Sequence, residues 1–147
     1  MKRSVRHAQR GSSLVETSIV MVVLLLVLFG IIDFGRLMYT YAFVAQLARQ
    51  GARYAIVRGS QCSVLSNCPN VTSAQIQTYV QSLSEGATTA SAISSTTTWT
   101  CPNNQSASEN PGCTANVSVS YTFNPIFPYI KIGSLNLTST SQMVISQ

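Results

Sequence analysis

Charged residues are scarce in this sequence, and their scarcity excludes most catalytic chemistry. Only 9% of the 147 residues are charged. The acidic residues are Glu16, Asp33, Glu85 and Glu109. The one histidine, His7, lies near the N-terminus, so the serines and threonines have no candidate general base nearby in sequence, and a glycine-rich phosphate loop is also missing. We therefore expect no enzymatic activity, no cofactor and no small-molecule substrate; a secreted enzyme on an uncleaved signal anchor is disfavoured.

The positive charges are concentrated at one end of the chain. Nine basic and four acidic residues give a net charge of +5. Four of the nine lie in the first ten residues: Lys2, Arg3, Arg6 and Arg10. Without residues 1–11, five basic and four acidic residues remain, a net charge of +1. Because this remainder has no basic stripe with interleaved aromatic residues, we expect no nucleic-acid partner.

The sequence has one long apolar run, from Leu14 to Ile32, which contains a single charged residue, Glu16. As a helix, this run would be roughly 28 Å long, close to the hydrocarbon thickness of a bilayer. A buried core helix is disfavoured because the rest of the chain is too polar to surround it. The run is too long for a cleaved secretory signal and lacks a small-residue cleavage site after it. The basic residues before the run place the N-terminus in the cytoplasm.

Glu16 is anomalous within this membrane segment. An unpaired carboxylate there costs on the order of 3 kcal/mol, so such a residue usually has a partner and a function. Cleavage between Gly11 and Ser12 would create an amine on Ser12, with Glu16 as the fifth residue of the product. A carboxylate near a helix N-terminus is also favoured by the helix dipole.

Helical spacing continues beyond the apolar run. Apolar or small residues recur at steps of three and four along one face: Leu37, Tyr41, Val44, Ala48, Gly51 or Ala52, and Ala55. We therefore predict one helix from Ser12 to about Val57, on the order of 70 Å long, whose first half crosses the membrane. The small residues of its second half, which include Ala45, allow a backbone to approach closely. Packing on the protein's own sheet is favoured over packing on another chain, and both can hold on different arcs of the helix.

Charged residues share faces of this helix in two places. Asp33 and Arg36 are three residues apart and can form a salt bridge at the membrane edge, worth a few tenths of a kcal/mol if exposed. Arg49 and Arg53 are four apart and repel each other mildly. For this second pair, a solvated face is favoured over contact with headgroup phosphates or with acidic residues of a partner.

Four cysteines follow the helix, at Cys62, Cys68, Cys101 and Cys113. An even number in a small exported domain indicates disulfides, with three possible connectivities. We favour the sequential pairing, in which Cys62 bonds Cys68 and Cys101 bonds Cys113, because each pair closes a short loop rich in Asn, Ser, Pro and Gly. Zinc binding is disfavoured because no Cys-x-x-Cys spacing is present.

The C-terminal part contains the signals of one short helix and three strands. Residues 72–75 resemble a capping box, and Ile76, Tyr79, Val80 and Leu83 then share one helical face. Strict alternation predicts a strand from Ala115 to Phe123, with weaker strands at 93–101 and 135–145. We favour the first of these weaker strands over a Ser/Thr-rich linker. The predicted fold is therefore α+β and pilin-like: a long N-terminal helix against a small antiparallel sheet.

Two motifs give the N-terminal third a family resemblance. The first is the basic leader, Gly11, and Glu16 ahead of an apolar helix. The second combines residues 29–36, FGIIDFGR, with residues 48–55, ARQGARYA. Together they resemble the TadE family of pseudopilins from the tight-adherence (Flp) pilus machinery, closely over residues 10–58.

The resemblance implies a processed membrane protein of bacterial pilus assembly. Prepilin peptidase would cut between Gly11 and Ser12, leaving Glu16 as an assembly contact with the Ser12 amine. The implied partners are this peptidase, other pilin-like subunits and the inner-membrane assembly platform. The domains would be a leader (1–11), a transmembrane helix (12–32), its extracytoplasmic continuation (33–58) and a disulfide-stabilised α+β domain (59–147). The alternative is an uncleaved bitopic anchor whose outer domain binds a cell-envelope partner.

Overall fold

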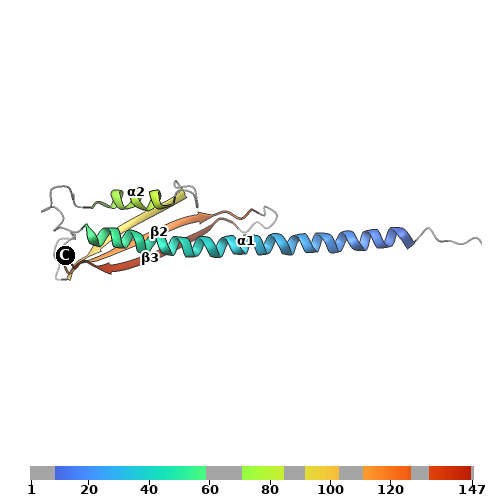
Figure 1. The fold of residues 1–147 in the computed structure, drawn as a ribbon, viewed down its shortest axis with the longest axis horizontal. Helices are drawn as coiled ribbons and strands as arrows, with labels where there is room; N and C mark the ends of the chain where they lie inside the picture. Colours follow the sequence, from blue (N-terminus) through green and yellow to red (C-terminus); the bar gives the residue numbers. More distant parts are fainter. Residues whose placement is uncertain (1–8, 59–70, 85–91, 103–110, 127–132, 147) are drawn as a thin grey trace, which may run out of the picture.

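The computed structural model describes residues 9–58, 71–84, 92–102, 111–126 and 133–146. Within them, the elements follow in the order α1 (Gln9–Val57), α2 (Ser73–Leu83), β1 (Ile93–Thr100), β2 (Thr114–Phe123) and β3 (Leu135–Val144). The strands and α2 gather around the C-terminal half of α1, and the N-terminal half of α1 projects beyond them (Figure 1). The fold is α+β, as the sequence predicts.

Helix α1 is continuous over 49 residues. It has no proline, and its apolar half is rich in leucine, valine and isoleucine, which lie toward solvent or lipid without needing polar partners. The helix ends at Val57, as predicted, but begins at Gln9 rather than Ser12. The predicted start was wrong because Gln9 and Arg10 have good helix propensity and nothing ahead of Ser12 ends the helix.

The three strands form one antiparallel sheet in the order β1-β2-β3. Val117 pairs with Thr97 of β1 and Ser141 of β3, which fixes the register. On β2, Val117 and Val119 are fully buried, while the alternate residues face outward. The alternation in the sequence therefore predicted both the strand and its buried face.

The inner face of the sheet packs on the small residues of α1. Ala48, Ala52 and Ala55 are fully buried. A Cβ atom added at Gly51 would lie 3.1 Å from methyl groups of both Val117 and Val80, so glycine lets the sheet and α2 approach the helix closely. These residues thus pack on the protein's own sheet, and the alternative of packing on another chain is wrong for them.

One residue of the predicted apolar stripe, Tyr41, is exposed and does not face the sheet. Tyr41 is 55% exposed, and its neighbour Thr40 is buried instead. Burial of Thr40 is possible because its hydroxyl donates a hydrogen bond of 2.8 Å to the carbonyl oxygen of Arg36. The three- and four-residue spacing predicted that Tyr41 faces the sheet. In the structure, the helix face that contacts the sheet includes Thr40 instead.

Helix α2 begins at the predicted capping box. The Thr72 hydroxyl accepts from the Gln75 backbone N–H at 3.3 Å, and the Gln75 side chain accepts from the Thr72 N–H at 3.1 Å. Ile76 and Val80 are fully buried, and the Tyr79 ring stacks on Tyr54 of α1 at 4.1 Å. Leu83, predicted on the same buried face, is 39% exposed because it lies in the last turn of the helix.

The inner face of β1 contains polar groups that lack hydrogen-bond partners: the Ser95 hydroxyl, the Thr97 hydroxyl and the Trp99 indole N–H. Thr97 is the most buried of them, at 7% exposure. A buried hydroxyl without a partner costs about 1–3 kcal/mol. Because Ser95 and Thr97 are polar although they lie on the inner face, the sequence of β1 lacks a clear alternation of apolar and polar residues, and its strand signal is weak.

We expect Thr97→Val to stabilise the domain by about 1 kcal/mol, because valine keeps the shape and removes the unpaired hydroxyl. Equilibrium denaturation of the full-length protein in detergent would measure the change. Thr98→Val is the matched control, since Thr98 is the next residue on the exposed face, and it should change stability by less than about 0.5 kcal/mol. Equal effects of the two substitutions would show that strand propensity, not the buried hydroxyl, is responsible.

Candidate membrane helix, processing site and assembly contact

The apolar half of α1 has an exposed surface. Every residue from Leu14 to Ile32 is exposed, and no part of the most apolar stretch of the helix is buried. Figure 1 shows this half as a bare rod. A core helix would be covered by the other elements, so this arrangement contradicts the buried alternative and fits a single membrane-spanning helix.

The polar residues near the start of this helix satisfy their own hydrogen bonds. The Thr17 hydroxyl donates to the Ser13 carbonyl oxygen at 2.6 Å, and the Ser18 hydroxyl donates to that of Val15 at 2.8 Å. Such bonds to the preceding turn lower the cost of placing a hydroxyl in lipid. Thr17 and Ser18 therefore do not prevent the segment from entering the membrane.

Glu16 differs from these hydroxyl residues. It is exposed, and the one salt bridge among the described residues lies elsewhere, between Arg36 and Asp33. Gly11 and Ser12 lie in the first turn of α1, so Glu16 follows Ser12 by about one helical turn. The backbone thus places residues 12 and 16 on the same face of the helix, the arrangement that a pairing of the Ser12 amine with Glu16 requires.

Asp33 and Arg36 form the ion pair that their spacing predicts, with 3.5 Å between the guanidinium Nη1 and the carboxylate Oδ1. Two further contacts were missed. The backbone N–H of Ile126 donates to the same Asp33 oxygen at 3.2 Å, and the Arg36 guanidinium lies 5.5 Å from the centre of the Phe123 ring. Both partners are about 90 residues away in sequence, so no local pattern could have identified them.

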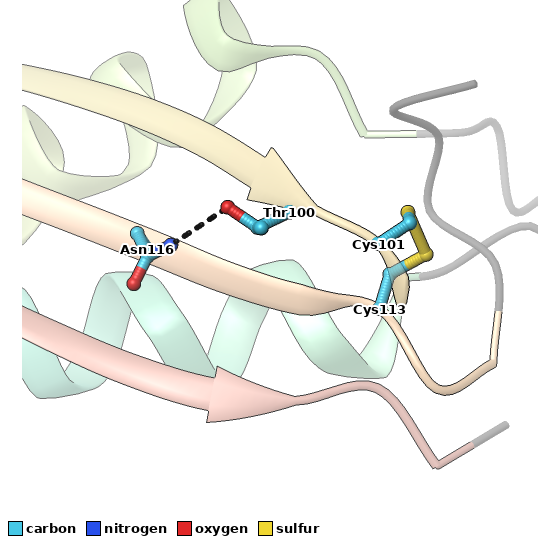
Figure 2. Close-up of a disulfide and its surroundings, with 4 residues drawn as sticks. All are labelled: Thr100, Cys101, Cys113 and Asn116. Carbon is cyan, nitrogen blue, oxygen red and sulfur yellow. Dashed lines mark hydrogen bonds between the residues drawn. A yellow bond between two sulfur atoms is a disulfide. The ribbon is translucent and has the colours of Figure 1, made fainter. Parts of the chain in front are cut away.

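Cys101 and Cys113 form a disulfide with Cα atoms 4.2 Å apart. The bond joins the chain just after β1 to the residue just before β2, and beside it the Asn116 amide donates to the Thr100 hydroxyl at 3.5 Å (Figure 2). This is the second bond of the sequential pairing. The predicted bond between Cys62 and Cys68 lies outside the described residues.

The described residues contain no group of three or more His, Cys, Asp or Glu residues that could hold a metal. A pocket lies beside α1 and is lined by Gln46, Arg49, Gln50 and Arg53. The Arg49 guanidinium donates to the Ala45 carbonyl oxygen of its own helix at 3.2 Å, and both arginines are exposed.

Residues 11–53 match the family model of the TadE-like proteins. No curated protein and no solved structure matches the chain. The matched segment begins at Gly11 and includes Glu16, the apolar half of α1 and the Asp33–Arg36 pair. The resemblance to the TadE family is therefore confirmed over residues 11–53, and this part of the chain forms a TadE-like segment.

Proposed function

We propose that this protein is a TadE-like pseudopilin or minor pilin that acts in the assembly of a tight-adherence pilus, after prepilin peptidase cuts it between Gly11 and Ser12. One observation carries the proposal: the family match begins at Gly11 and continues through an exposed apolar helix long enough to cross a membrane. The proposed role is that of an assembly component and not of an enzyme.

The mechanism follows from the cost of burying charge. After cleavage, the Ser12 amine and the Glu16 carboxylate would lie one turn apart at the cytoplasmic end of the span. Pairing them, within one subunit or between neighbours, offsets the desolvation of both. A subunit paired in this way packs its apolar helix beside other pilin-like helices while the inner-membrane platform moves it.

The same proposal gives the location of each part. The chain is a single-pass protein of the bacterial inner membrane, with its N-terminus in the cytoplasm and the sheet domain outside. The disulfide between Cys101 and Cys113 supports this orientation, because disulfides persist in the periplasm and are rare in the cytosol.

A second function is supported by the continuity of α1 across the cleavage junction, from Gln9 onward. An uncut chain would be a bitopic anchor, and its outer domain would bind a cell-envelope partner. Gly11 and Glu16 would then have no role in processing or assembly. The two functions differ in the N-terminus of the membrane-bound protein.

We expect the membrane-bound protein to begin at Ser12 in cells with active prepilin peptidase and to keep the leader in cells without it. Intact mass and terminal sequencing would measure this. Gly11→Val should block the cut, whereas Gly30→Val should leave it unchanged, because a side chain at position 30 meets nothing within 4 Å in the protein. A leader retained beside an active peptidase would favour the uncut anchor.

A further inference from the structure

The end of β2 is fixed against α1 just beyond the apolar run. The Ile126 N–H donates to Asp33, one residue after Ile32, and Phe123 lies against Arg36. Strand β3 begins beside this point, since Leu135 pairs with Phe123. Figure 1 shows β2 and β3 lying along α1, with the end of β2 and the start of β3 directed toward the projecting half of the helix. The contacts therefore fix the height of the hairpin relative to the membrane span.

The apolar run of α1 indicates where the bilayer edges lie. Leu14 to Ile32 is about 28 Å of helix, which matches the hydrocarbon thickness of a bilayer. With this run in the hydrocarbon, Asp33 lies at its outer edge. A carboxylate at that depth requires cover. The Asp33 side chain is 17% exposed, and its partners are Arg36 and the Ile126 N–H.

Exposed apolar and aromatic side chains lie on α1 just beyond the apolar run, and also just after β2 and at the start of β3. We call them the interfacial patch: Phe34, Met38, Tyr39, Tyr41, Ile126 and Leu135. Ile126 and Tyr39 are each 62% exposed, and every member is at least 38% exposed. Met38 lies about 7.5 Å beyond Asp33, within the headgroup region of a bilayer.

The composition of the patch matches the outer interface of a membrane. Tyrosine is enriched at this height, where its ring lies among the headgroups and its hydroxyl reaches water. The patch is also continuous with the exposed apolar surface of the span, which ends at Ile32. Lipid therefore fits this surface better than a protein partner, which would have to cover the hairpin and the helix together.

We propose that the chain at Ile126, just after β2, and at Leu135, the start of β3, is a second membrane contact, which lies in the outer interfacial region of the bilayer with Ile126 exposed to lipid. This contact holds the sheet domain against the membrane surface and covers Asp33 at the hydrocarbon edge. The proposal rests on the membrane-spanning helix and does not depend on a role in a pilus.

Tryptophan quenching in liposomes tests this depth. The full-length protein would be reconstituted in phosphatidylcholine with acyl chains brominated near the headgroup, in a Trp99→Phe background. Ile126→Trp should be quenched at least about threefold more strongly than Gln142→Trp, an exposed position near the far end of β3, about 23 Å from Leu135. Leu135→Trp gives a second measurement if Ile126→Trp does not fold.

The controls separate the possible results. Tyr39→Trp should be quenched in any inserted protein, and its failure would overturn the span and the proposal together. Quenching at Tyr39→Trp without quenching at Ile126→Trp would overturn the hairpin contact alone. A blue-shifted but unquenched emission from Ile126→Trp would show that protein, not lipid, covers this position.

Discussion

Replacing Glu16 with glutamine is expected to leave the protein in the membrane but reduce the number of pili on the cell by about a hundredfold. Glutamine keeps the shape of the side chain and removes its charge. Counting pili by electron microscopy would measure assembly, and immunoblotting of membrane fractions would measure insertion. This expectation depends on the proposed pseudopilin role.

The size of the effect follows from the cost of an unpaired charge. A charged group within the span costs on the order of 3 kcal/mol, and each 1.4 kcal/mol corresponds to about a tenfold change in an equilibrium. Without Glu16, the amine created on Ser12 by cleavage has no carboxylate to pair with, so assembly becomes less favourable by the free energy of this unpaired charge. Insertion of the uncut chain should not become less favourable, because the glutamine variant has one charge fewer in the span.

Two variants give the controls for this experiment. Glu16→Asp keeps the charge and should retain most of the pili, whereas Ser18→Ala removes an exposed hydroxyl two residues away that bonds only its own helix, and it should have no effect. Normal piliation of the Glu16→Gln variant would remove Glu16 from the mechanism. Loss of the variant protein from the membrane would instead indicate a role in insertion.

Local patterns in the sequence predicted most elements of this fold. The capping box at Thr72 and Gln75 located the start of α2, and the alternation around Val117 located β2 and its buried face. These signals are reliable because both depend on residues close together in sequence. The predicted helix of α1 was correct in type and at its C-terminal end for the same reason.

Contacts between distant segments could not be predicted in this way. Thr40, not Tyr41, faces the sheet, because the sheet selects the face of α1 that it covers. The hydrogen bond from Ile126 to Asp33 joins residues 93 positions apart, and the sequence predicted only the local Arg36 partner. The proposed processing site at Gly11, Ser12 and Glu16 depends on a local spacing in the sequence, and it stays a prediction.

Removing the disulfide between Cys101 and Cys113 with a Cys101→Ala, Cys113→Ala double variant should lower the stability of the sheet domain by about 3 kcal/mol. The bond closes a loop of sequence separation 12. Closing a loop of about this length removes that amount of conformational entropy from the unfolded chain. For a domain of this size, we expect the melting temperature to fall by about 15 °C.

The position of the bond makes the sheet sensitive to its loss. Cys113 is fully buried, and its carbonyl oxygen accepts from the Ile145 N–H at 2.8 Å. The Gly112 N–H donates to the Ile145 carbonyl oxygen at 2.8 Å, and Gly112 has a φ of 88°, which favours glycine. The turn next to the bond therefore also holds the chain just after β3. Loss of the disulfide should weaken both the β1–β2 pairing and the β2–β3 pairing at this end of the sheet.

Trp99 provides the readout, because it pairs with Ala115 close to the bond and lies on the inner face of β1. Its fluorescence in detergent should report earlier melting of the sheet domain in the double variant, while the far-ultraviolet helical signal from the span remains. Thr100→Ala is the control: it removes an exposed side chain beside the bond and should change stability little. An unchanged melting temperature in the double variant would mean that the packing of the sheet on Ala48 and Gly51 of α1 already constrains this end of the domain without the bond.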